Sequence, residues 1–217
     1  CVLVYISLTF FVLCTLGLFI KGYLSENNRR KLFCYILSYI SCTLAFYTKG
    51  FIGIVVPGLS ILTFLILDKN LKEVLNMRLW LGILIFIILA FPWFIALWHQ
   101  GGTEYLNVFL LHNHLQRFLP ASMAGTISGS VSGHHHPFYY YITGFPTSFL
   151  PWSILLIPVL YHTFSKAGRS FGLSEKGRLF AKCWFFSGII LLSVASTKRT
   201  LYLMPIFAPI AMLTALY

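Results

Sequence analysis

The chain has 217 residues, of which 58% are hydrophobic and only 10% are charged, and its formal net charge is +11. A soluble domain has about 25% charged residues, so this composition excludes a soluble globular protein and predicts an integral membrane protein. The positive charge does not indicate a nucleic-acid partner, because the cations lie in short segments between apolar runs. The five cysteines lie in or beside such runs without CxxC spacing, so we interpret them as packing residues and not as disulfides or metal ligands.

Apolar runs follow one another along the whole sequence. A spanning helix needs roughly 20 apolar residues, and seven runs reach or approach that length. They cover residues 1–20, 32–48, 51–67, 79–98, 138–162, 183–197 and 201–217. We therefore predict an all-α, polytopic membrane helical bundle with about seven transmembrane helices, forming a single transmembrane domain over residues 1–217. Both ends of the chain fall inside apolar runs, so we expect it to be a fragment of a longer protein.

The distribution of lysine and arginine predicts how this bundle is oriented. Twelve of the 16 cations fall in loops on one side of the predicted membrane, and by the positive-inside rule that side is cytoplasmic. We expect these basic loops to act as topology signals and to contact anionic lipid headgroups. The other side receives Lys49, Arg117, Lys198 and Arg199.

These four outer cations lie at the ends of apolar runs, where the positive-inside bias disfavours them. A cation deep in the bilayer costs about 2.5–3.5 kcal/mol on insertion scales, so their presence suggests an anionic partner. Snorkelling of the side chain to the headgroups explains any one of them equally well. For the four together, we favour a site for the phosphate of a lipid.

The most polar stretch covers residues 99–137, which we expect to form an outer segment with a short interfacial helix over residues 104–118. His114 and Arg117 are three residues apart and share one face of that helix, where they could bind phosphate. His112 or His114 could ligate a divalent metal, or simply form hydrogen bonds at the membrane surface. Among the five acidic residues only Glu104 lies on the outer side, so a carboxylate base has at most one candidate there.

Four sequence blocks resemble a known family in their order and spacing. They are Thr48-Lys49-Gly50-Phe51 with Pro57, His112 to Phe118, His136 to Tyr141 with Leu150-Pro151-Trp152, and Lys198 to Tyr202 with Leu203 and Pro205. Together they span about residues 46–210. The chain resembles the integral-membrane glycosyltransferases of the GT-C superfamily, close to the bacterial aminoarabinose transferases and the protein O-mannosyltransferase-like proteins.

The resemblance implies a transfer of sugar from a polyprenyl-phosphate donor to a lipid or protein acceptor, on the periplasmic or outer face of a bacterial inner membrane. It implies that Arg117 and lysine side chains hold the lipid phosphate and that Tyr202 lines the donor cavity, to which we also assign Tyr140. One histidine of the block that contains His112 and His114 would help to bind a metal.

Two departures from the family pattern limit these assignments. Many relatives carry an acidic residue where this chain has Asn113, which weakens the metal assignment. The catalytic aspartate of the family lies in a first outer loop, which we expect upstream of Cys1, so we assign no catalytic residue in this chain.

The resemblance favours an inverting displacement, in which outer cations stabilise the departing lipid phosphate. Two other functions stay open. A transporter or flippase for a lipid-linked anion would use the same cations without chemistry, and Pro57-Gly58 and Phe91-Pro92 interrupt two helices as they do in transporters. A non-catalytic assembly subunit is the other alternative. The polar groups cluster at the outer helix ends and not near the bilayer midplane, which favours the transferase.

Overall fold

The structure is a computed structural model that describes residues 2–107, 139–155, 157–159, 161, 174–194, 198 and 200–215. Its helices are α1 (Val2–Tyr23), α2 (Asn28–Lys49), α3 (Ile52–Leu67), α4 (Glu73–Asn76), α5 (Leu79–Asn107), α7 (Tyr140–Ser148), α9 (Glu175–Val194) and α10 (Met204–Ala215). Short 3-10 helices cover Trp152–Leu155 (η2) and Thr200–Leu203 (η4). No strand occurs within the described ranges, so the predicted all-α fold is confirmed.

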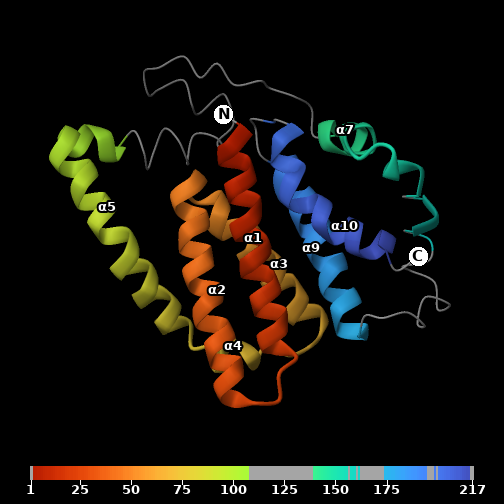
Figure 1. Ribbon diagram of the computed structural model, residues 1–217, viewed down its shortest axis with the longest axis horizontal. Coiled ribbons are helices and arrows are strands. Elements are labelled where there is room, and N and C mark those ends of the chain that lie inside the picture. Colours follow the sequence, from red (N-terminus) through yellow and green to blue (C-terminus); the bar gives the residue numbers. More distant parts are fainter. Residues whose placement is uncertain are drawn as a thin grey trace.

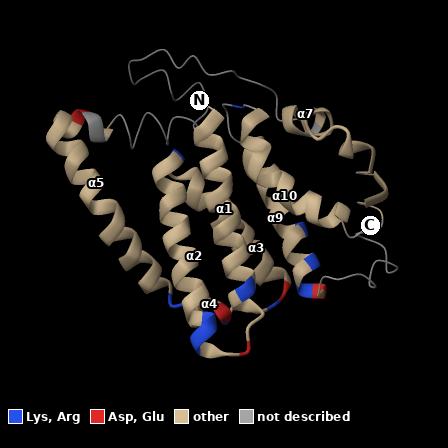
Figure 2. Cartoon of the chain, viewed as in Figure 1, with Lys and Arg blue, Asp and Glu red and all other residues tan. Residues whose placement is uncertain are grey.

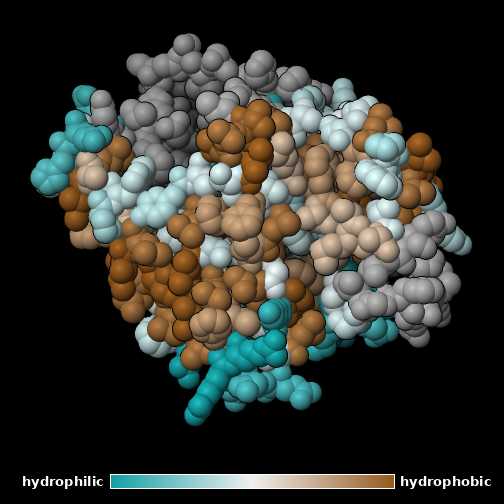
Figure 3. Space-filling view, in the orientation of Figure 1, coloured by the Kyte–Doolittle hydropathy of each residue, from teal (hydrophilic) through white to brown (hydrophobic). Residues whose placement is uncertain are grey.

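Four of these helices are long and apolar enough to cross a membrane, namely α1, α2, α5 as far as Glu104, and α9. Two further apolar helices are shorter, α3 and the segment from Thr200 to Ala215. Figure 3 shows the resulting apolar band across the middle of the visible face, with hydrophilic side chains below it. The protein is an integral membrane protein, as its composition predicted.

Helices α1, α2, α3, α9 and α10 run side by side, and α5 leans away from them (Figure 1). Aromatic side chains fill the contact between α1, α3 and α9. The Phe64 ring lies 6.2 Å from that of Phe19 and 5.3 Å from that of Phe180, centroid to centroid, in edge-to-face geometry. A second buried cluster joins α7, α9 and α10 around Phe145, Phe185 and Ile206. Edge-to-face packing of this kind adds to the stabilisation from burial alone.

The predicted spanning run over residues 138–162 has a different structure from the one expected. Helix α7 ends at Ser148 after nine residues, and the chain turns before the 3-10 helix that starts at Trp152. Pro151 lies at this turn, where its ring and missing N–H disfavour a continuous α-helix. The apolar composition of the run was correctly read, but its described part is not a single straight helix.

The two ends of the bundle differ in charge (Figure 2). We call the end where α1 ends and α2 begins the basic end. Its described cations are Lys21, Arg29, Arg30, Lys31, Lys69, Lys72, Arg78, Lys176, Arg178 and Lys182. The opposite end carries Lys49 and Lys198, and Glu104 lies near the end of α5 there. The uneven distribution seen along the sequence is therefore present in three dimensions.

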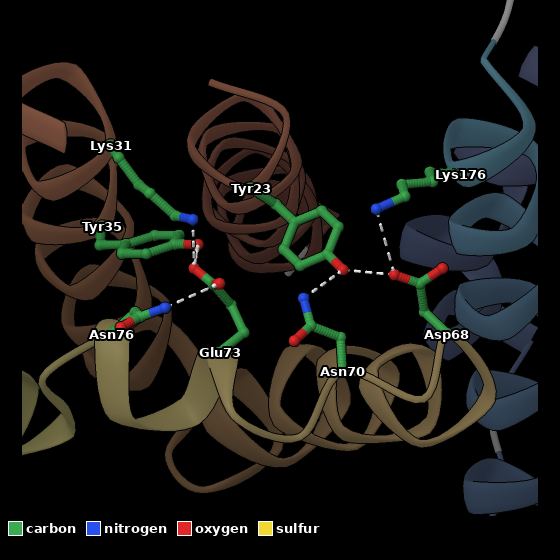
Figure 4. Close-up of polar contacts among 8 residues, drawn as sticks. All are labelled: Tyr23, Lys31, Tyr35, Asp68, Asn70, Glu73, Asn76 and Lys176. Atoms are coloured by element: carbon green, nitrogen blue, oxygen red, sulfur yellow. Dashed lines mark hydrogen bonds and ion pairs between the residues drawn. The ribbon is translucent and has the colours of Figure 1, made fainter. Parts of the chain in front are cut away.

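At the basic end, a buried carboxylate joins α2 to α4 (Figure 4). Lys31 Nζ lies 2.7 Å from Glu73 Oε1, the Tyr35 hydroxyl donates to the same oxygen at 2.7 Å, and Asn76 Nδ2 donates to Oε2 at 3.2 Å. Burial alone would raise the pKa of the Glu73 carboxyl, but these three donors outweigh it and hold the pKa below its usual value. Glu73 is therefore an ionised member of a satisfied network.

A second carboxylate joins α1, α3 and α9 at the same end (Figure 4). The Tyr23 hydroxyl donates to Asp68, and Asn70 Nδ2 donates to the Tyr23 oxygen at 2.9 Å. Lys176 Nζ lies 3.5 Å from Asp68 Oδ2 and 5.1 Å from the centroid of the Tyr23 ring. A hydrogen bond and an ion pair to Asp68 thus connect α1 and α9 to the end of α3 at the basic end.

Candidate functional site

The turn between α2 and α3 places Lys49 at the opposite end of the bundle. Gly50 caps α2 with φ 70°, a conformation that favours glycine, and its N–H donates to the Phe46 carbonyl at 2.6 Å. Helix α3 then passes so close to α2 that a Cβ at Gly53 would lie 2.5 Å from the Ala45 carbonyl carbon. The Lys-Gly break expected from the sequence is therefore a tight turn with a lysine on the last residue of α2.

Two tyrosine rings hold the side chain of Lys49. Its Nζ lies 3.3 Å from the centroid of the Tyr5 ring and 4.6 Å from that of the Tyr202 ring. The two rings are 5.6 Å apart, tilted by 57°. We call these three residues the tyrosine cage. Because an ammonium is attracted to the face of an aromatic ring, the cage orients a cation while leaving its formal charge in place.

The cage brings together three parts of the chain. Tyr5 lies near the start of α1 and is buried, Lys49 ends α2, and Tyr202 belongs to η4. Lys49 and Tyr202 were both singled out from the sequence, whereas Tyr5 was not. Tyr5 lies inside an apolar run with no motif around it, and no local signal separates it from a packing residue.

Tyr140 joins this end of the molecule through a hydroxyl pair. Its Oη lies 3.1 Å from Thr200 Oγ1, which connects α7 to η4 two residues before Tyr202. The structure therefore brings Tyr140 close to the tyrosine cage in the fold, although 60 residues separate the partners of this hydrogen bond.

Lys198 lies in the connection between α9 and η4 and is buried, with 4% of its surface exposed. Burial lowers the pKa of its ammonium, because an apolar surrounding disfavours the charged form. A buried ammonium of this kind gains most from an anionic partner. The chain thus has two lysines at an end that holds one described acidic residue, Glu104.

The other predicted site residues lie outside the described residues. These are Arg117 and Arg199 of the predicted phosphate site, and His112 and His114 of the tentative metal site. Within the described residues, no group of three or more His, Cys, Asp and Glu side chains could hold a metal ion. The predicted interfacial helix over residues 104–118 is described only as far as Asn107, in a helical segment that follows a break at Gly101 and Gly102.

Comparison with known proteins supports the family resemblance predicted from the sequence. The family model for dolichyl-phosphate-mannose-protein mannosyltransferase matches residues 1–102. The chain is 29% identical over 188 residues to the undecaprenyl phosphate-alpha-4-amino-4-deoxy-L-arabinose arabinosyl transferase of Pectobacterium carotovorum subsp. carotovorum strain PC1, covering 87% of this chain and 31% of that protein. The predicted resemblance to the GT-C membrane glycosyltransferases is confirmed. A protein of the same description from Yersinia pestis strain Pestoides F is 28% identical over 193 residues, and the match covers 89% of this chain and 32% of that protein.

A solved structure shares the fold. The crystal structure of ArnT from Cupriavidus metallidurans bound to undecaprenyl phosphate matches 97% of this chain and 36% of its own chain, with a TM-score of 0.79 and 20% identity. The same protein in the apo state matches with a TM-score of 0.75. The chain therefore spans about a third of the length of these relatives.

Proposed function

We propose that the complete protein is a membrane glycosyltransferase that moves a sugar from a polyprenyl-phosphate donor to a lipid or protein acceptor. The transfer would take place at the end opposite the basic end, which faces the periplasm or the outside if the basic end is cytoplasmic. We place the protein in a bacterial inner membrane, and the names of the relatives suggest an undecaprenyl-phosphate-linked aminoarabinose as the donor to test first. Residues 1–217 would form one transmembrane domain, with residues 99–137 as its outer segment.

The observation that carries this proposal is the tyrosine cage. Lys49 and Tyr202 come from two separate blocks of the family resemblance, about 150 residues apart, and yet their side chains meet at the end with few cations. A lysine whose ammonium lies against two aromatic rings is suited to holding a phosphate, because the ammonium is positioned before the ligand binds. Buried Lys198, in the connection that precedes η4 and Tyr202, adds a second positive charge.

In the proposed reaction, an acceptor hydroxyl oxygen attacks the anomeric carbon of the sugar. The bond from that carbon to the phosphate oxygen breaks, and the polyprenyl phosphate leaves with the bonding electron pair. The hydroxyl proton passes to a carboxylate base, for which we expect an aspartate upstream of Cys1. Lys49 and Lys198 would stabilise the negative charge that develops on the departing phosphate, together with Arg117 and Arg199.

Tyr202 and Tyr140 would line the donor cavity beside these cations. Tyr202 supports Lys49 directly, and Tyr140 supports η4 through Thr200. A divalent metal at His112 or His114 stays a prediction, since both histidines lie outside the described residues.

The test uses the complete protein in proteoliposomes with undecaprenyl-phosphate-linked aminoarabinose that is radiolabelled in the sugar. We expect label to move to an acceptor, with lipid A-type and protein acceptors offered separately. Movement of intact donor across the bilayer without transfer would instead identify a flippase. If the label is neither transferred nor moved across the bilayer, both functions are overturned, and an assembly subunit is favoured.

A further inference from the structure

A groove of about 520 Å³ lies between α3 and α5. Helix α2 lines it as well, and the residues just before α5 line the part nearest the basic end. The volume falls within the range of roughly 300–1,000 Å³ that is typical of ligand sites. Helix α5 creates this space because it approaches α2 at Gly82, where a Cβ would lie 2.9 Å from the Tyr39 ring, and then leans away from the bundle (Figure 1).

The polar side chains that line the groove use their hydrogen-bonding groups within the protein. Their hydroxyls and the one thiol contact backbone carbonyls or, for Tyr35, the Glu73 carboxylate. The donors are Thr15, Tyr35, Ser38, Tyr39, Cys42 and Thr43. The groove therefore offers an incoming molecule mainly hydrocarbon and ring carbon, which suits a fatty chain and not a polar solute.

Exposed cations lie where the groove reaches the basic end. Met77 and Leu79 both line it, and the exposed side chain of Arg78 stands between them in the sequence. Lys72 is also exposed, two residues before groove-lining Val74. Trp80 is 61% exposed next to Leu79, as expected of an aromatic residue at a membrane surface.

We propose that this groove binds one acyl chain of an anionic phospholipid in the leaflet at the basic end, with its phosphate against Arg78 and Lys72. The chain would lie along α3 and α5, and the headgroup would remain at the surface where the cations and Trp80 lie. An anionic headgroup is favoured over a zwitterionic one, because each nearby Lys or Arg attracts the negative charge. The proposed headgroup position is at the basic end, opposite the end that holds the proposed sugar-transfer site.

Gly58 provides a direct test of the acyl-chain part. It lines the groove, and a Cβ built there meets no atom within 4 Å, so a side chain can extend from this position and Gly58→Leu should occupy part of the groove. Gly17 is the matched control, because it lies on the exposed side of α1, also meets no atom within 4 Å, and does not line the groove. With the complete protein in nanodiscs of mixed phosphatidylglycerol and phosphatidylcholine, native mass spectrometry would measure the lipid that stays bound. We expect Gly58→Leu to reduce retained phosphatidylglycerol about tenfold, as the loss of two buried methylenes would, and Gly17→Leu to leave it unchanged.

The headgroup part is tested by surface substitutions that do not disturb packing. Replacing Lys72→Gln and Arg78→Gln together should weaken the preference for phosphatidylglycerol over phosphatidylcholine about thirtyfold. The proposal is overturned if wild-type protein retains both lipids equally or neither, if the double variant keeps the preference, or if Gly58→Leu and Gly17→Leu behave alike. Because the measurement detects bound lipid and not sugar transfer, its failure is distinct from a failure of the proposed transferase.

Discussion

The two ends of the helical bundle hold their lysines in different ways. At the basic end, Lys31 and Lys176 lie against the carboxylates of Glu73 and Asp68. At the opposite end, Lys49 lies against the rings of Tyr5 and Tyr202. A carboxylate cancels the charge of a lysine, whereas an aromatic ring orients the ammonium without cancelling it.

This difference assigns the two ends different roles: the basic end stabilises the fold, and the opposite end is suited to binding. Paired charges and satisfied hydrogen bonds at the basic end join α2 to α4, and join α1 to α3 and α9. At the opposite end, two tyrosine rings orient Lys49, and Lys198 is buried. We therefore expect substitutions at the basic end to change the stability of the fold, and substitutions at the opposite end to change turnover of the proposed donor.

The largest effect is expected for Glu73→Gln at the basic end. The substitution leaves Lys31 without its ion-pair partner, and we expect a loss of about 3 kcal/mol in the free energy of unfolding, because breaking a buried pair costs roughly 3–5 kcal/mol and Lys31 keeps some access to water. Unfolding in detergent, followed by circular dichroism, measures it. Glu26→Gln is the control, since Glu26 is an exposed carboxylate at the same end.

The same pair predicts an acid dependence. The pKa of Glu73 is lower in the folded protein than in the unfolded chain, so its contribution to stability is present above the usual glutamate range and is lost as pH falls through the lowered value. Glu73→Gln should remove this part of the acid sensitivity. A variant as stable as wild type at neutral pH, or equally acid-sensitive, would contradict the stabilising role of the basic end.

The next largest effect is expected for Lys49→Met in the complete protein. Removing one positively charged group aimed at a developing negative charge typically lowers kcat by about 100-fold or more. Lys176→Met is a close control, because Lys176 also lies over a tyrosine ring but at the basic end. Sugar transfer at the wild-type rate by Lys49→Met, or an equal loss in both variants, would remove the functional distinction between the two ends.

A smaller effect is expected at Tyr5, which we assign as a positioning residue for Lys49. Tyr5→Phe retains the ring and should leave kcat/KM for the donor close to wild type, while Tyr5→Leu should lower it by about tenfold through loss of the cation–π contact. If the phenylalanine and leucine variants show the same kcat/KM, the ring of Tyr5 does not position the ammonium.

The smallest effect is a shift in pH dependence at Lys198. Because burial lowers its pKa, the ammonium is lost at a lower pH than for an ordinary lysine, and donor binding should weaken as pH rises through that value. Lys198→Arg keeps its charge at any such pH and should extend the range of tight binding upward. The measurement is KM for the donor against pH, and an unchanged alkaline limb in the arginine variant would exclude Lys198 from phosphate binding.

The sequence by itself determined the membrane class, the all-α fold, the positions of most helices and the uneven charge of the two ends. These properties are sums over neighbouring residues, so local composition is enough to predict them. The resemblance also selected Lys49 and Tyr202, because each lies in a recognisable block.

Only the tertiary structure decided which side chains meet. Tyr5 has no local feature that sets it apart, and its place beside Lys49 depends on how α1 and α2 are rotated against each other. Tyr23 and Asp68 are 45 residues apart and meet for the same reason. Apolar composition also could not separate one spanning helix from the broken segment around Pro151, since both are equally apolar and the difference depends on the local geometry of proline.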